Sequence, residues 1–204
     1  MTPLCLRLMA LDDIPQIATL EKRVFTVPWS PRTYAYEVTE SDSSHMVVLS
    51  GVAPASRPPS GLMRLLNALG YTSEAESLVL AYGGLWNLID EAHISTIASH
   101  PEHRGRGYGE AALAGMMRRA IVIDAAYVAL EVRVSNIGAQ ALYRKYGFDV
   151  HGVKHRYYLD NNEDAYDMRV HLDDQQRRAV EQLYKSIRSR LGFSDSYTEA
   201  THNL

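Results

Sequence analysis

The sequence predicts an α/β (α+β) fold with a mixed, mostly antiparallel central sheet of about seven strands and helices on both faces. Strand-like and helix-like segments follow one another in the order β-α-α-β-β-β-α-β-α-β-β. Two pairs of successive strand-like segments are joined by short polar turns, which is typical of antiparallel hairpins. The chain has 204 residues, of which 46% are hydrophobic, enough to bury a substantial core.

The first elements follow from apolar spacing and capping residues. Leu4 to Leu8 alternates as a strand, and Ala10 to Val24 has apolar residues at helical spacing behind two aspartates. A second helix is expected in "PWSPRTYAYEVTES", with Ser30 as its N-cap and Pro31 as its first residue. The segment "HMVVLSGV" is then a short strand.

Residues 51–77 are expected to form an insertion between the second and third strands. The segment "APASRPPS" at 53–60 holds three of the eight prolines and breaks all periodicity. The following "LMRLLNALG" could form one or two helical turns that end at Gly70. Whether the insertion is a lid over a substrate or a tolerated loop stays open.

The second half predicts two hairpins and two helices. The strands "SLVLAYGGLWNLI" and "EAHISTIAS" are joined by a turn at Asp90 and Glu91, and should pair antiparallel. Glu110 to Ala120 is expected to be a helix, "AYVALEVRV" an alternating strand, and Ile137 to Tyr146 a helix closed by Gly147. The strands "FDVHGVKHRYYL" and "AYDMRVHL" surround the polar turn "DNNED".

The chain is divided into a domain over residues 1–170 and a C-terminal helical extension over 171–204. The helix between Asp173 and Leu191 carries its apolar residues on one stripe, formed by Val180, Leu183, Ile187 and Leu191. Its basic residues lie elsewhere on the helix: Arg177, Arg178, Lys185, Arg188 and Arg190. They are expected to form a solvated face, and the alternative is a partner contact or a homodimer through the apolar stripe.

Composition and charge exclude several classes of function. The net charge of -3 and the absence of a long Lys/Arg block argue against direct nucleic-acid binding. A single cysteine, Cys5, excludes an intrachain disulfide. With no signal-like start and no apolar run that could cross a bilayer, a cytoplasmic protein without membrane contact is expected. His100 and His103 lack further ligands at metal spacing, so no metal is expected.

The stretch "HPEHRGRGYGEAALAG" predicts a phosphate-binding turn. A glycine-rich turn from a strand into a helix exposes backbone N–H groups at the positive end of the helix dipole. A Walker loop would need Gly-Lys, which is absent, and a dinucleotide fingerprint would need G-x-G-x-x-G. The pattern that remains is R-x-x-G-x-G, formed by Arg104, Gly107 and Gly109 after "TIASHPEH".

Together with "LEVRVSNIGAQALYRKYGF", this pattern resembles the GNAT acetyltransferase superfamily. It is most similar to the RimI-type enzymes, which acetylate the N-terminal alanine of a small-subunit ribosomal protein. Tyr157-Tyr158, followed by Glu163-Asp164-Ala165 and Met168, is similar to the same group, as is "VFTVPWS". The resemblance covers residues 1 to 170 outside the insertion. It implies acetyl-CoA as cosubstrate and a protein N-terminus, such as that of a ribosomal protein, as the acceptor.

The resemblance also assigns cofactor-binding residues. Backbone groups of "STIAS" would face the thioester carbonyl and pair with the amides of the pantetheine arm. Asn136 would hydrogen-bond the arm, a role compatible with capping the next helix. The full set is Ile97, Ala98, Ser99, Arg104, Gly105, Arg106, Gly107, Tyr108, Gly109, Glu110 and Asn136.

Glu131 and Tyr143 are the predicted catalytic residues. Acyl transfer to an amine requires a neutral amine and stabilisation of the leaving thiolate. An ordinary glutamate takes a proton from an α-ammonium at a cost of about 5 kcal/mol. We therefore expect either that burial raises the pKa of Glu131 or that water relays the proton. Tyr143 is expected to donate a hydrogen bond to the thiolate. The alternatives are a solvated charge for Glu131 and a core position for Tyr143.

The acceptor peptide is expected to lie against the residues Phe25, Val27, Pro28, Trp29, Tyr157 and Tyr158. Phe25 and Trp29 could instead form a satellite core. Adjacent tyrosines in a strand point to opposite faces, so both face the site only if a bulge intervenes.

Two other functions stay open. An acetyltransferase for a small amine or a lysine side chain would be favoured if Trp29, Tyr157 and Tyr158 faced away from the cleft. A non-catalytic CoA-binding regulator is the third hypothesis, and the presence of Glu131 and Tyr143 argues against it.

Overall fold

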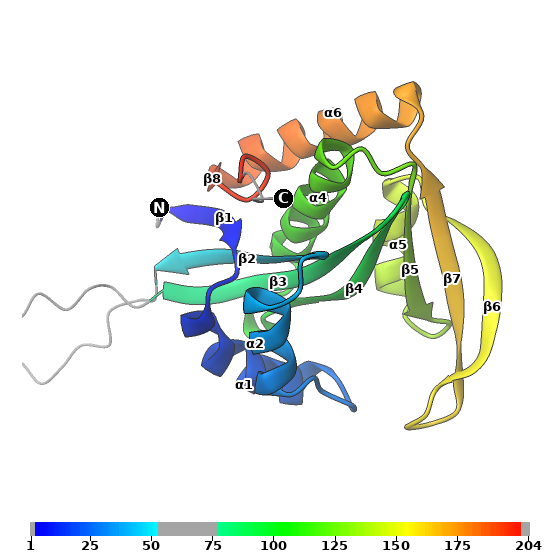
Figure 1. The fold of residues 1–204 in the computed structure, drawn as a ribbon, viewed down its shortest axis with the longest axis horizontal. Coiled ribbons are helices and arrows are strands. Elements are labelled where there is room, and N and C mark those ends of the chain that lie inside the picture. The colour runs from blue at the N-terminus through cyan, green and yellow to red at the C-terminus, as the bar shows by residue number, and fades with distance from the viewer. Residues whose placement is uncertain (1–2, 53–76, 201–204) are drawn as a thin grey trace, which may run out of the picture.

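The computed structural model describes residues 3–52 and 77–200 (Figure 1). Its strands are β1 (Leu4–Leu8), β2 (Ser44–Val52), β3 (Ser77–Leu88), β4 (Glu91–Ser99), β5 (Tyr127–Arg133), β6 (Asp149–Tyr158), β7 (Glu163–His171) and β8 (Phe193–Asp195). They form one sheet in the order β6-β7-β5-β4-β3-β2-β1-β8. Only β1–β8 and β4–β5 pair in parallel among the described strands. The predicted mixed, mostly antiparallel sheet is confirmed.

Seven strands lie where the sequence predicts them, and β8 is an addition. Its three residues pair with Leu4, Cys5 and Leu6 of β1. A strand of three residues is too short to show an alternating apolar pattern in the sequence. It is recognised only from its pairing with β1.

The α-helices of the described residues are α1 (Ile14–Val24), α2 (Pro31–Thr39), α4 (Tyr108–Val122), α5 (Ile137–Lys145) and α6 (Asp174–Leu191), with short 3-10 turns η1 (Leu11–Asp13) and η2 (Pro101–His103). The predicted start of α2 is confirmed, because the Ser30 hydroxyl accepts a hydrogen bond from the Thr33 N–H. The helix predicted from Glu110 begins two residues earlier, at Tyr108.

The helices cover both faces of the sheet (Figure 1). α1 and α2 lie on one face, and α4 and α6 on the other. Successive residues of β2 serve opposite cores: Val47 packs on the α4 side, and Val48 packs with Ile17 and Tyr34 on the other. Strands that are buried on both faces read as continuous apolar runs, which explains the weak alternation of "HMVVLSGV".

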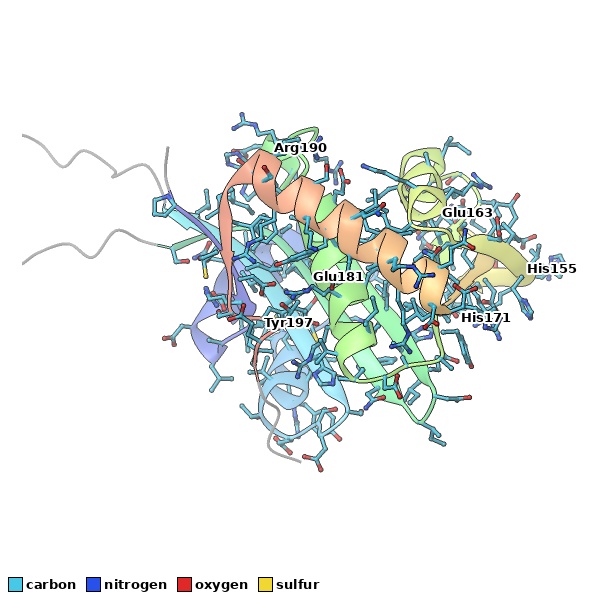
Figure 2. All side chains as sticks on the ribbon, turned by 90° about the horizontal axis from the view of Figure 1, so that it is seen from above. His155, Glu163, His171, Glu181, Arg190 and Tyr197 are labelled. Atoms are coloured by element: carbon cyan, nitrogen blue, oxygen red, sulfur yellow. The ribbon has the colours of Figure 1, made fainter. Side chains whose placement is uncertain are left out.

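The C-terminal segment shares the core of the domain. α6 lies across α4 (Figure 2), and Val180, Tyr184 and Ile187 are buried in the same cluster as the α4 side chains. The Tyr184 hydroxyl donates to Asp195, which ties α6 to β8. The apolar stripe expected as a possible homodimer contact is thus packed within its own chain, and a homodimer would need another surface.

The boundaries of the predicted insertion are corrected at both ends. Gly51 and Val52 continue β2, and Ser77 begins β3, because the two strands pair out to Val52 opposite Ser77. The predicted helical turns that end at Gly70 lie outside the described residues. In the described part of the chain, no helix is long and apolar enough to cross a membrane.

Candidate active site

The centre of the sheet opens between β4 and β5. The two strands pair only over Glu91–Ile94 and Tyr127–Leu130. Beyond that point β4 has a bulge at Ser95, since β3 matches Gly84 to Thr96 but Leu85 to Ile94. A bulge bends a strand and increases its twist. The remaining parts of β4 and β5 therefore separate, as Figure 1 shows.

This opening belongs to a cleft of about 1280 Å³. Sites for drug-sized ligands usually measure about 300–1,000 Å³, so the cleft is large enough for a long cofactor arm together with part of a second substrate. All the predicted site residues except Pro28 and Arg106 line it. Pro28 and Arg106 are exposed beside it.

The glycine turn lies at one end of the cleft. Gly105 and Gly107 have φ values of +76° and +86°, in the left-handed region that glycine adopts without strain. Gly107 caps α4, and a Cβ atom there would lie 2.6 Å from a guanidinium nitrogen of Arg190. The first N–H groups of α4 have no partner within the helix. The turn therefore presents backbone donors and the positive end of the helix dipole to the cleft.

Glu110, in the first turn of α4, is held by two cations. Its carboxylate accepts from Lys145 at the end of α5, and from Arg190 at 2.9 Å. Figure 2 shows Arg190 at the C-terminal end of α6. The two cations offset the negative charge of Glu110, which would otherwise oppose an anion at this turn.

Glu131 projects from β5 into the cleft and has two polar partners, the imidazole of His93 and the ammonium of Lys154. Its Oε2 lies 3.1 Å from the Nε2 of His93, and its Oε1 accepts from the Lys154 ammonium. Burial alone would raise the pKa of Glu131, but the hydrogen bonds with His93 and Lys154 outweigh it and lower the pKa to about 2. Of the two alternatives expected for Glu131, a pKa raised by burial is therefore wrong, and relay of the proton by water stays a prediction.

Tyr143 and Asn136 reach the cleft from α5. Tyr143 is buried, and burial raises the pKa of its phenol above the ordinary value. A phenol that holds its proton so firmly acts as a hydrogen-bond donor rather than an acid. The Asn136 Oδ1 accepts from the Ala139 N–H at 3.2 Å, so Asn136 is the N-cap of α5.

Tyr157 and Tyr158 both line the cleft because β6 is irregular before them. Arg156 has a φ of +52°, and the β6–β7 register shifts between Lys154 and Tyr158. The two rings meet edge to face, with centroids 5.2 Å apart. The bulge that the sequence interpretation required for both tyrosines is present.

Trp29 and Phe25 line the cleft and also pack on the α1/α2 core. The Trp29 ring stacks on Trp86 at 6.0 Å. The backbone N–H of Trp29 donates at 2.9 Å to Glu21, a buried carboxylate that also accepts from the hydroxyls of Tyr34 and Tyr82. Three donors satisfy the buried carboxyl group and hold the loop after α1 in place.

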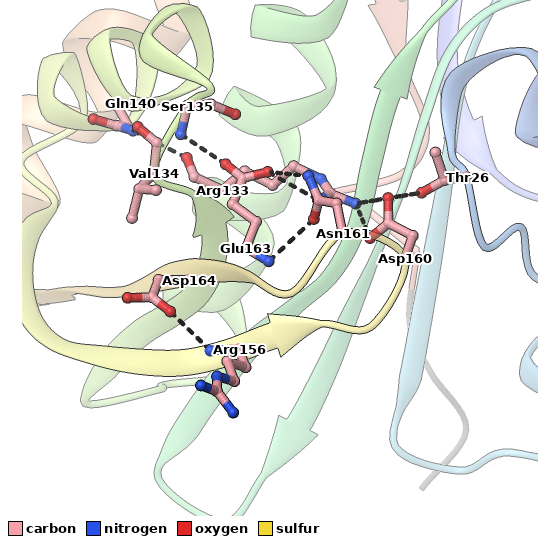
Figure 3. Close-up of polar contacts among 10 residues, drawn as sticks. All are labelled: Thr26, Arg133, Val134, Ser135, Gln140, Arg156, Asp160, Asn161, Glu163 and Asp164. Atoms are coloured by element: carbon pink, nitrogen blue, oxygen red, sulfur yellow. Dashed lines mark hydrogen bonds and ion pairs between the residues drawn. The ribbon is translucent and has the colours of Figure 1, made fainter.

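A network around Arg133 joins two loops at the mouth of the cleft (Figure 3). The Arg133 guanidinium pairs with Asp160 in the β6–β7 turn and with Glu163 at the start of β7, each at 2.9 Å. The Thr26 hydroxyl, from the loop after α1, donates to Asp160 at 2.7 Å. The same guanidinium lies 3.8 Å above the Tyr158 ring. The two loops that would contact an acceptor are therefore fixed to each other.

Sequence reasoning missed Glu21, His93, Arg133 and Lys154 as members of the site. Arg133 carries a local signal, because it is two residues after Glu131 and so shares its face of β5. His93 and Glu21 come close only through strand pairing and helix packing, for which a single sequence has no signal.

The Acetyltransferase (GNAT) family matches residues 14–148, so the chain belongs to the GNAT acetyltransferase family. Its curated relatives narrow the class to N-acetyltransferases of the RimI type. A Bacillus subtilis protein with the provisional name ribosomal protein bS18-alanine N-acetyltransferase is 32% identical over 173 residues, which are 85% of this chain and 99% of the relative. The N-alpha-acetyltransferase RimI of Mycobacterium tuberculosis is 30% identical, over 82% of this chain and 92% of the relative.

Solved structures agree with this fold. The ribosomal-protein-S18-alanine N-acetyltransferase of Escherichia coli superposes with a TM-score of 0.64 at 24% identity, over 83% of this chain and 94% of the other. Ard1 of Thermoplasma volcanium has a TM-score of 0.65 at 19% identity, over 84% of this chain and 99% of the other.

Proposed function

We propose that this protein transfers the acetyl group of acetyl-CoA to the α-amine of a protein N-terminus, with the N-terminal alanine of ribosomal protein bS18 as the acceptor. The observation that best supports this function is a single cleft. It is lined by the glycine turn, Glu131, Tyr143, Tyr157 and Tyr158. The names of the relatives from Bacillus subtilis and Escherichia coli support this acceptor.

The chain's own groups fit acetyl-CoA at two places. Backbone N–H groups of the 105–109 turn and the first turn of α4 would bind the diphosphate. Residues 97–99 of β4 lie beyond the pairing with β5 and line the cleft, so their backbone is positioned to pair with the pantetheine amides as an added strand would. Asn136, which already caps α5, would contact the same arm.

An N-terminal amine suits this site better than a lysine. An α-amine has a pKa of about 8 and a lysine side chain about 10.4, so deprotonating the lysine costs about 3.3 kcal/mol more. A carboxylate whose pKa is held near 2 is a weak base. Trp29, Tyr157 and Tyr158 line the cleft. A small-amine acceptor would be favoured if these side chains faced away from the cleft, so their position supports an N-terminal peptide as the acceptor.

In the proposed reaction, Glu131 receives the amine proton, directly or through water. Backbone N–H groups of residues 97–99 stabilise the oxyanion that forms on the thioester carbonyl. The Tyr143 hydroxyl donates a hydrogen bond to the departing thiolate and keeps its own proton.

Short peptides that begin with Ala, Ser or Met and contain an internal lysine test the proposal, each with a free or a blocked N-terminus. Free-thiol release from acetyl-CoA gives the initial rate. We expect the free Ala peptide to react fastest and the blocked peptides not to react. Blocked peptides that react as fast as free ones would instead identify a lysine acetyltransferase. Binding of acetyl-CoA without thiol release from any peptide would identify a non-catalytic protein.

A further inference from the structure

Arg190 is a cation that the C-terminal helix places at the glycine turn. It belongs to the last turn of α6 (Figure 2), whereas the family match ends at residue 148. Its Nη2 donates to the Oε2 of Glu110 at 2.9 Å. The same Nη2 lies 2.6 Å from the position that a Cβ atom of Gly107 would occupy. A helix outside the family match therefore contacts two residues that line the cleft.

The packing of α6 on α4 holds Arg190 in this place. Ile187, about one helical turn before it, is buried, and its Cδ1 lies 3.3 Å from the same Cβ position at Gly107. Nearer the start of α6, Glu181 pairs with Arg118 of α4 at 3.0 Å. Residues three apart in a helix lie on one face, so Arg190 shares the α4-facing side of α6 with Ile187. A packed helix, and not a loop, supplies the guanidinium.

The charges at the turn do not cancel. Glu110 carries one negative charge, and Lys145 and Arg190 bring two positive charges to it. One cation would be enough to neutralise the carboxylate. Exposed ion pairs contribute little to stability, and the Arg190 side chain is 56% exposed. A ligand therefore explains the second cation better than the stability of the fold does.

The guanidinium also has free hydrogen-bond donors. It carries five N–H groups in a planar fork that matches the geometry of phosphate oxygens. Within residues 3–52 and 77–200, its hydrogen bond is the contact of Nη2 with Glu110, which leaves Nη1 and Nε for a second anion. Because Nη2 touches the turn at Gly107, an anion bound by the backbone N–H groups of the turn comes within reach of the guanidinium.

We propose that Arg190 binds the diphosphate of acetyl-CoA together with the glycine turn, and that Glu110 holds the guanidinium in place before the cofactor arrives. A side chain that is already oriented loses little conformational freedom when its ligand binds. The inference rests on the proposed function in taking acetyl-CoA as the ligand. Its test needs no acceptor, so it can fail while N-terminal acetylation stands.

Calorimetry with acetyl-CoA and the full chain, without peptide, measures the effect. We expect Arg190→Gln to weaken binding by about tenfold, because charge-assisted hydrogen bonds to phosphate are strong. Arg190→Lys should recover part of this loss, since an ammonium still binds phosphate as a point charge. The affinity of Arg190→Gln should also fall less steeply with salt concentration than that of the wild type, because one cation fewer meets the phosphates.

Arg178→Gln is the matched control. It makes the same change of charge on an exposed position of α6, twelve residues before Arg190 and therefore about 18 Å away along the helix. At that distance salt screens the charge, so the affinity for acetyl-CoA should stay within about twofold of wild type. An equal loss of affinity in Arg178→Gln and Arg190→Gln would overturn the inference, because it would reflect only the net charge of α6.

A double-mutant cycle with Glu110→Gln separates direct contact from neutralisation of Glu110. If Arg190 contacts the diphosphate, Arg190→Gln should still weaken binding by about tenfold in the Glu110→Gln background. A loss that disappears in that background would overturn the proposal, since Arg190 would then only cancel the charge of Glu110.

The choice of ligand distinguishes the diphosphate from the other phosphate of the cofactor. The loss in Arg190→Gln should be the same with 3′-dephospho-acetyl-CoA, which keeps the diphosphate. A loss seen with acetyl-CoA alone would assign Arg190 to the 3′-phosphate and overturn the proposal. A protein that binds acetyl-CoA as expected here but acetylates no free N-terminus would instead remove the proposed function and leave this inference standing.

Discussion

The carboxylate of Glu131 has a more complicated environment than its sequence context indicates. The alternating strand "AYVALEVRV" identifies it as the one carboxylate of that strand. Its two hydrogen-bonding partners, His93 and Lys154, however, come from β4 and β6, and they lower its pKa where burial alone would raise it. Pairwise interactions at about 3 Å outweigh partial desolvation here, because an opposite charge at contact distance favours the ionised form.

Glu131→Gln and Tyr143→Phe should each lower turnover without weakening cofactor binding. We expect kcat to fall by about 10²- to 10⁴-fold for Glu131→Gln, the range over which general bases contribute, and by less for Tyr143→Phe, which loses only a hydrogen-bond donor. Thiol-release kinetics and calorimetry with acetyl-CoA measure the two effects. Glu102→Gln, an exposed change outside the cleft, serves as the control. Wild-type turnover in both site variants would remove both residues from the mechanism.

The element that carries the cofactor prediction is the turn before α4. Its glycines differ in what surrounds them: a Cβ at Gly105 would meet open space, whereas one at Gly107 would contact Arg190 and Ile187 of α6. The glycine pattern of the sequence is typical of a turn that needs positive φ values. The contact with α6 was not, because α6 is about 80 residues away along the chain.

Gly107→Ala should therefore lower the affinity for acetyl-CoA more than Gly105→Ala does. Both changes place a Cβ in the left-handed region, at a cost of about 1–2 kcal/mol each. Gly107→Ala also displaces the Arg190 guanidinium and should lower acetyl-CoA affinity by at least about tenfold. Urea denaturation and calorimetry separate stability from affinity. Equal affinities for the two variants would show that the approach of α6 to the turn has no effect on the cofactor.

For the whole molecule, the open question is whether the segment after residue 170 is an appendage. The proposed division into a domain over 1–170 and a helical extension over 171–204 rests on helical periodicity. In the structure, Val180, Tyr184 and Ile187 are buried against α4, and β8 adds a strand beside β1. The apolar stripe of α6 is thus part of the core over which the cofactor turn lies.

Ile187→Ala tests this coupling. Ile187 is 2% exposed, so its truncation should destabilise the protein by about 2–5 kcal/mol. Its Cδ1 also lies 3.3 Å from the position of a Cβ at Gly107, so acetyl-CoA affinity should fall as well. Lys185→Ala, on the exposed face of the same helix, is the control and should change neither. A change of less than about 0.5 kcal/mol in Ile187→Ala would support an independent extension.

The sequence by itself determined the element order, the glycine turn, and the identities of Glu131, Asn136 and Tyr143, because these depend on local periodicity, capping and motif spacing. Tertiary structure alone decided the separation of β4 from β5 at the Ser95 bulge, the placing of both tyrosines in the cleft, and the contact of His93 with Glu131. Those features arise from strand register and from side chains far apart in the chain. Strand register depends on the pairing partner, and a single sequence does not specify that partner.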